Sequence, residues 1–169
     1  MWLIDERLWL GDYRSGRAAL SGTRQPVGAT GSKQPFSGVV SLCPMPLFSD
    51  DDLSGPAETL TEWLKLPIAD GGNGEREFEL ALQIALPFIE RRQLSGNVLV
   101  HCAAGMSRSV SVIAAVLCAR GLAPGVAYEM IATRKAEALG PFVDHDLLIA
   151  PAREFRATLD RLFGRRGAV

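Results

Sequence analysis

The sequence has few cysteines and no excess of charge of either sign. Its 169 residues include three cysteines, Cys43, Cys102 and Cys118, without paired spacing. This pattern argues against a disulfide framework and against a zinc site of the usual kind. Eighteen Lys and Arg against nineteen Asp and Glu give a formal net charge of -1, so no bulk positive field is available to attract nucleic acid or an anionic membrane. We therefore expect no metal, no other cofactor, no nucleic-acid partner and no membrane partner.

Long apolar runs are missing as well. Asp5, Glu6 and Arg7 interrupt the first apolar residues before a signal-peptide core can form. No apolar run approaches the length of a membrane span. Together with the unpaired cysteines, these absences predict a cytoplasmic location. The length and the 47% hydrophobic content predict one compact domain covering residues 1–169.

Short apolar runs alternate with amphipathic helical patterns along the chain. The runs predict strands at the start of 7–13 and at 38–43, 62–68 and 98–101; the helical patterns cover 15–20, 75–92, 109–120, 125–138 and 143–163. Residues 21–37, rich in Gly, Ser, Thr, Gln and Pro, predict a loop. The alternation predicts an α/β fold with a central, mostly parallel sheet flanked by helices. In such sheets, ligands bind beyond the carboxyl ends of the strands.

The segment after the predicted strand 98–101 has the composition of an anion-binding loop. Cys102 follows the strand, and Arg108 lies just before the next helix. The small residues between them allow the backbone N–H groups to converge on one point, and the helix N-terminus adds its positive dipole end. Arg108 adds a planar fork that matches two oxygens of a tetrahedral anion. The predicted substrate-binding residues are Ala103, Ala104, Gly105, Met106, Ser107 and Arg108.

The same loop predicts a nucleophile. A cysteine pKa of about 8.5 falls to roughly 3.5–7.5 at a helix N-terminus or near a cation, so Cys102 should be largely a thiolate at neutral pH. A thiolate beneath a phosphate monoester indicates displacement to a cysteinyl-phosphate, followed by hydrolysis. Asp70, in a glycine-rich loop after the predicted strand 62–68, is the expected general acid and base. We expect Ser109 to assist departure of the Cys102 sulfur, and His101 to fix the loop through backbone hydrogen bonds.

The run "HCAAGMSRS" at 101–109 resembles the signature of the cysteine-dependent protein tyrosine phosphatases, and its "AAG-SRS" frame resembles the small dual-specificity branch. Asp70 stands where that branch carries its general acid, and "RLWLGDY" resembles its opening strand and turn. The resemblance implies a protein tyrosine phosphatase-like fold. It also implies metal-independent hydrolysis of phosphotyrosine, and often of phosphoserine and phosphothreonine. Ala103, Ala104 and Met106 add no charge to the loop, which favours a phosphorylated protein or peptide over a phosphoinositide.

The other cysteines and one histidine have separate interpretations. Some relatives carry a second cysteine at a similar strand end that forms a reversible disulfide with the nucleophile, which implies that Cys43 is a redox partner of Cys102. The position of Cys118 within an apolar helical pattern predicts a core residue. The acidic residues 50–52 are interpreted as a solvated cluster, and His145 between two aspartates as part of a charged helical turn, not as metal sites.

Two alternatives remain open at the level of sequence. One is an enzyme for phosphoinositides or other small phosphate esters. The other is a non-catalytic module that binds phosphoproteins, although a binder would need neither the nucleophile nor the acid. The sequence also leaves open the physiological substrate, the preference among phosphorylated residues and the oligomeric state.

Overall fold

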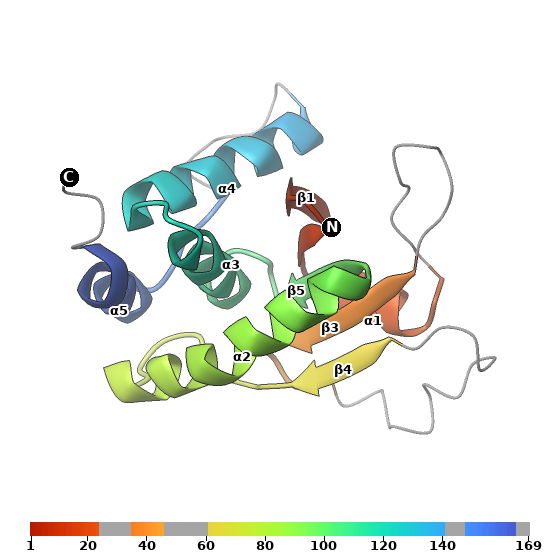
Figure 1. Ribbon diagram of the computed structural model, residues 1–169, viewed down its shortest axis with the longest axis horizontal. Helices are drawn as coiled ribbons and strands as arrows, with labels where there is room; N and C mark the ends of the chain where they lie inside the picture. Colours follow the sequence, from red (N-terminus) through yellow and green to blue (C-terminus); the bar gives the residue numbers. More distant parts are fainter. Residues whose placement is uncertain (24–34, 46–60, 141–147, 165–169) are drawn as a thin grey trace.

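The computed structural model describes residues 1–23, 35–45, 61–140 and 148–164 (Figure 1). Its elements are β1 (Trp2–Asp5), β2 (Leu8–Gly11), α1 (Tyr13–Leu20), β3 (Phe36–Ser41), β4 (Glu62–Lys65), α2 (Glu75–Ser95), β5 (Asn97–His101), α3 (Arg108–Ala119), α4 (Pro124–Leu139) and α5 (Arg153–Phe163). Most of the predicted loop 21–37, the acidic residues 50–52 and the His145 segment lie outside the described residues.

The strands form one sheet in the order β1-β2-β5-β3-β4. β2, β5, β3 and β4 pair in parallel, and only β1 is antiparallel to its neighbour, which confirms the predicted mostly parallel sheet. His101 at the end of β5 lies level with Gly11 of β2 and Ser41 of β3. The carboxyl ends of these strands therefore meet at one edge of the sheet, where the loops that follow them converge.

The sequence analysis did not find β1. This strand forms a hairpin with β2 through Glu6 and Arg7, and Arg7 has a positive φ of 55°. Two-residue hairpin turns of this kind usually carry Asn or Gly at such positions, so an arginine gives no turn signal. The other boundaries differ at their ends: β3 begins two positions before the predicted strand. α5 begins only at Arg153, because Pro151 disfavours helical backbone in the residue before it.

Two apolar clusters hold the helices on opposite faces of the sheet. Val40, Val98 and Val100 contribute to the larger cluster, which includes apolar residues of α2, α3, α4 and α5. Val39 and Leu99 contribute to the smaller cluster with α1. α3 is buried from Arg108 to Cys118, and Figure 1 shows it between the sheet and the neighbouring helices α4 and α5. The N-terminus of α3 is thereby fixed relative to the end of β5.

α1 packs directly against His101, the last residue of β5. Gly16 of α1 faces the His101 ring so closely that a Cβ on Gly16 would stand 2.3 Å from His101 Nε2. The His101 ring is fully buried and is held in place by a contact of 2.6 Å between its Nε2 and Ser41 Oγ. A glycine at position 16 is therefore a packing requirement and not a helix preference.

We predict that Gly16→Ala lowers the free energy of unfolding by about 1–3 kcal/mol, the usual cost of overpacking a core. Gly125→Ala is the matched control, because that helical glycine has no neighbour within 4 Å of the added Cβ. The control should gain up to about 1 kcal/mol from helix propensity. Urea denaturation measures both variants, and a Gly16→Ala protein as stable as the control would contradict the packing argument.

Candidate active site

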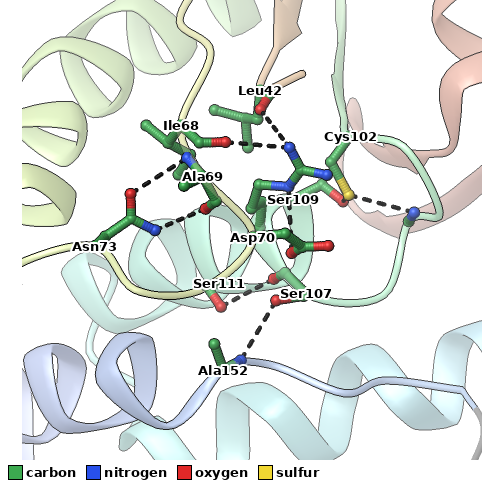
Figure 2. Close-up of polar contacts among 12 residues, drawn as sticks. Leu42, Ile68, Ala69, Asp70, Asn73, Cys102, Ser107, Ser109, Ser111 and Ala152 are labelled. Carbon is green, nitrogen blue, oxygen red and sulfur yellow. Dashed lines mark hydrogen bonds and ion pairs between the residues drawn. The ribbon is translucent and has the colours of Figure 1, made fainter. Parts of the chain in front are cut away.

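The candidate site is the loop 102–107 between β5 and α3 (Figure 2). Several of its carbonyl groups are held on the outside of the loop. Ala103 O accepts a hydrogen bond from Tyr13 N–H at 3.0 Å, and Met106 O accepts one from Ala150 N–H at 2.8 Å. In a planar trans peptide the following N–H points the opposite way. These outer hydrogen bonds therefore turn the next N–H groups towards the inside of the loop.

Gly105 is required at the tightest point of the loop. Its φ is 69°, and a Cβ there would stand 3.0 Å from Gly11 O and 3.1 Å from Trp2 Cζ3. The β1–β2 hairpin therefore presses directly on the outer side of the loop. The Gly105 N–H points inward and donates to Cys102 Sγ at 3.3 Å.

Cys102 combines burial with hydrogen bonding. Its relative exposure is 1%, and its Sγ lies 3.1 Å from Ser109 Oγ in addition to the Gly105 N–H contact. Burial by itself raises the pKa of the Cys102 thiol. The hydrogen bonds from Ser109 and Gly105 and the charge of Arg108 outweigh this effect and leave the Cys102 pKa below its ordinary value. The site therefore favours a thiolate.

Arg108 is anchored on one side and unsatisfied on the other. It is 7% exposed, and its Nη1 donates to Leu42 O at 3.2 Å and to Ile68 O at 3.1 Å, two carbonyls that follow β3 and β4. Asp70 Oδ1 lies 3.2 Å from Arg108 Nε. This ion pair is not aligned as a hydrogen bond, and Nε finds no other acceptor among the described residues. A buried charged donor without an aligned acceptor is suited to bind an oxygen of an anion.

Asp70 stands on a separate, exposed loop beyond β4 (Figure 2). Its side chain is 51% exposed. Asn73 closes this loop by donating to Ala69 O at 2.6 Å and accepting from Ala69 N–H at 3.2 Å. Glu154 of α5 accepts the Gly72 N–H at 2.8 Å. The sequence analysis missed both anchors: Asn73 is the kind of residue that closes a turn, whereas nothing local signals Glu154.

His101 takes part in a buried chain of hydrogen bonds. Trp63 Nε1–H donates to Ser41 Oγ at 2.8 Å, Ser41 Oγ lies 2.6 Å from His101 Nε2, and His101 Nδ1 lies 3.4 Å from Cys102 O. Burial lowers the pKa of His101 to about 4, so the ring is neutral at pH 7 and carries one proton. A carbonyl oxygen can only accept, so the Nδ1 that faces Cys102 O carries the ring proton, and Nε2 accepts the proton of the Ser41 hydroxyl. His101 then donates to the Cys102 carbonyl. The sequence did not indicate the other two members of this hydrogen-bond chain, Ser41 and Trp63.

The three cysteines are free and buried, but they differ in environment. Burial raises the pKa of Cys43, and raises that of Cys118 to about 11, in contrast to the lowered pKa of Cys102. Cys118 packs in the larger core cluster, as predicted. Cys43 packs in the smaller cluster on the α1 side, whereas Cys102 belongs to the larger one. The charges of Cys102 and Arg108 nevertheless act on Cys43, and a Cys43–Cys102 disulfide remains a prediction.

The remaining loop residues occupy different depths. Ala103 and Ala104 are exposed at the rim, Met106 is half-buried, and Ser107 is buried with its Oγ accepting the Ala152 N–H at 3.3 Å.

Within the part of the chain that the structure describes, no three His, Cys, Asp or Glu residues gather as a metal site. No helix in those ranges has the length and apolar character to cross a membrane.

Solved structures of other proteins share this fold. The crystal structure of human DUSP28 covers 98% of this chain and 96% of its own, with 19% sequence identity and a TM-score of 0.62. The crystal structure of Tk-PTP in the active form covers 96% of this chain and 95% of its own, with 23% identity and a TM-score of 0.66. At these identities the likeness shows the fold, that of the protein tyrosine phosphatases.

The family itself follows from the sequence comparisons. The family model "Dual specificity phosphatase, catalytic domain" matches residues 51–145, more than half of the chain. Dual specificity protein phosphatase Mpk3 of Drosophila melanogaster is 40% identical over 78 residues, 45% of this chain. The match spans only 18% of the fly protein. The chain belongs to the dual-specificity phosphatase family.

We predict that Ser109→Ala raises the pKa of the Cys102 thiol, because the thiolate loses the hydroxyl 3.1 Å away. The rate of Cys102 alkylation by iodoacetamide, followed across pH by peptide mass spectrometry, should reach half its maximum at higher pH than in the unaltered protein. Ser111→Ala is the matched control, because its Oγ donates to Ser107 O and not to the thiol. An unchanged Ser109→Ala profile would mean that this contact does not stabilise the thiolate.

Proposed function

We propose that this protein hydrolyses phosphotyrosine, phosphoserine and phosphothreonine in proteins through a cysteinyl-phosphate intermediate, without a metal ion. One observation carries the proposal: a thiol of lowered pKa, an inward N–H and an unsatisfied arginine N–H converge at the loop 102–107. Family membership supports the phosphatase class. The roles of the individual residues follow from the contacts of the site.

Substrate binding replaces one partner of Arg108 by another. In the absence of substrate, the Asp70 carboxylate lies against Arg108 Nε. A phosphate dianion seated on the loop brings better-aligned oxygens to the same N–H and displaces Asp70. Asp70 is then released from its ion pair with Arg108 and is free to approach the leaving oxygen. This exchange of partners is our reason for assigning Asp70 as the general acid.

The first chemical step forms the phosphoenzyme. The Cys102 thiolate attacks phosphorus in line with the leaving oxygen, the P–S bond forms and the P–O bond to the substrate breaks. The leaving oxygen takes the proton from Asp70. Inward N–H groups of the loop and the Arg108 guanidinium stabilise the charge on the phosphoryl oxygens during transfer.

The second step returns the enzyme to its starting state. The Asp70 carboxylate, now unprotonated, takes a proton from a water molecule that attacks phosphorus, and the P–S bond breaks. The departing sulfur becomes a thiolate, which the Ser109 hydroxyl at 3.1 Å stabilises by hydrogen bonding. The products are inorganic phosphate and the free Cys102 thiolate.

The rim of the site favours phosphorylated side chains of proteins over highly charged small molecules. Ala103 and Ala104 are exposed and uncharged, and Arg108 supplies the charge inside the loop. A phosphoinositide or inositol polyphosphate carries further phosphates, which these rim residues have no charge to match. A non-catalytic phosphoprotein binder is disfavoured because it would need neither a thiol of lowered pKa nor an acid poised beside the arginine.

We predict that Cys102→Ser abolishes turnover of a phosphotyrosine peptide in the presence of a chelator. Asp70→Asn should lower kcat by about 100-fold or more, the usual contribution of a general acid. The Asp70→Asn loss should be smaller on p-nitrophenyl phosphate, whose leaving group needs little protonation. Steady-state kinetics across pH measures both effects.

The matched controls are Cys43→Ser and Asp160→Asn. The first removes another buried thiol, and the second removes an exposed carboxylate of α5. Both should retain near-normal kcat. Residual turnover in Cys102→Ser, or loss of activity on adding chelator to the unaltered protein, would contradict cysteine-dependent, metal-free catalysis.

We further predict that kcat/KM is at least about tenfold higher on a phosphotyrosine or phosphothreonine peptide than on soluble inositol phosphates, equivalent to about 1.4 kcal/mol of transition-state stabilisation. Parallel phosphate-release assays at equal ionic strength measure this ratio. Faster hydrolysis of inositol phosphates would favour the small-ester alternative. Tight binding of phosphopeptide by a folded but inactive protein would favour the binding-module alternative.

A further inference from the structure

Lys135 of α4 lies on the outer side of the loop 102–107. It is 4% exposed, and its Nζ donates to Gly105 O at 2.9 Å and to Leu148 O at 2.7 Å. The ammonium also lies 4.4 Å from the centre of the Trp2 ring. The sequence analysis missed Lys135 because a lysine within an amphipathic helix is ordinarily a surface residue.

Among the described residues, no carboxylate forms an ion pair with this ammonium. Its described contacts are two carbonyl groups and an aromatic ring, whereas buried lysines usually pair with an acid. Two groups that face it can carry negative charge, Cys102 in the loop and Asp12 at the start of α1. Burial lowers the pKa of Lys135, and the charges of Cys102 and Asp12 act in the opposite direction. The charge of Asp12 is already stabilised by hydrogen bonds from Ser15 N–H and Oγ–H. We therefore take the Cys102 thiolate as the main electrostatic partner of Lys135.

The hydrogen bond to Gly105 O acts on the part of the loop that contacts the thiolate. Gly105 donates its own N–H to Cys102 Sγ at 3.3 Å. Holding the Gly105 carbonyl outward also turns the N–H of Met106 inward, because the peptide is planar and trans. Lys135 therefore constrains the peptide groups on both sides of the Gly105 Cα and places a positive charge behind them.

We propose that Lys135 is a positioning residue that fixes the Gly105 peptide and stabilises the Cys102 thiolate from outside the loop. This role rests on the proposed function of Cys102 as the nucleophile. Lys135 never touches the substrate. It acts through the backbone and through its charge, and removal of either contribution should be visible in the ionisation of Cys102.

The experiment compares alkylation of Cys102 by iodoacetamide across pH in the unaltered protein and in Lys135→Met, Lys135→Gln and Lys135→Arg, with peptide mass spectrometry to isolate Cys102. Lys135→Met should shift the midpoint upward by about one pH unit, the size that one nearby charge produces. Lys135→Arg retains charge and donors and should stay near the unaltered value. Lys135→Gln retains a donor without the charge and should fall between the two.

Arg134→Met is the matched control, because it removes the same charge from the exposed face of the same helix. It should leave the midpoint unchanged. In kinetics, the acid limb of kcat/KM for p-nitrophenyl phosphate should move upward with the alkylation midpoint in Lys135→Met, and Lys135→Arg should restore it. A folded Lys135→Met protein with an unshifted midpoint, or an equal shift in Arg134→Met, would overturn the proposal.

A measurement without substitution of Lys135 covers the case in which the neutral variants do not fold. Coupling between two charges is reciprocal, so the Lys135 ammonium should titrate at lower pH in Cys102→Ser than in the unaltered protein. NMR of the Lys135 side chain reports this, and an identical titration would overturn the proposal. Neither alkylation nor NMR needs turnover, so an inactive protein with the expected shifts would refute the proposed function and leave the Lys135 inference intact.

Discussion

A thiol that is 1% exposed can favour its charged form only if the groups around it replace the water it has lost. Here the replacement comes from N–H and O–H groups that point inward from the loop 102–107 and the start of α3. Their orientation depends on carbonyl groups that point outward and must themselves be satisfied. The partners of those carbonyls are Tyr13, Lys135 and Ala150. The loop is short, but segments from near both ends of the chain hold it in place.

This dependence explains which parts of the fold the sequence could predict. β5, the loop and α3 follow one another directly, so an apolar run, small residues and a second apolar run suffice to indicate them. The alternation of strands and helices indicates the parallel sheet for the same local reason. β1 gave no such signal, because its turn uses Arg7 where glycine or asparagine is expected. Yet β1 supplies Trp2, which packs behind Gly105.

The candidate site likewise contains residues that the sequence could predict and residues that it could not. The sequence predicts the placement of Cys102 and Arg108 because they stand at the two ends of one short connection between β5 and α3. It predicts that of Asp70 because Asp70 follows a strand whose carboxyl end must reach the same edge of the sheet. Ser41 and Trp63 meet His101 only through the pairing register of β3, β4 and β5, which no single segment encodes. The contacts of Lys135 and Glu154 need the packing of α4 and α5, which helical periodicity alone does not fix.

The two loops of the site, 102–107 with Cys102 and the loop after β4 with Asp70, differ in how firmly they are held. In the proposed mechanism Cys102 must stay still, because small displacements of Gly105 or Ser109 would remove hydrogen bonds that stabilise its thiolate form. Accordingly, Gly105 adopts its positive φ in close contact with Gly11 and Trp2. In the same proposed mechanism Asp70 must change partners, from Arg108 to the leaving oxygen and then to water. Gly72 in this loop also has a positive φ, but a Cβ added there would meet no atom within 4 Å, and two anchors at Asn73 and Glu154 hold the loop. The buried, closely packed thiol of Cys102 and the exposed, lightly anchored carboxylate of Asp70 therefore suit the different steps that we propose for them.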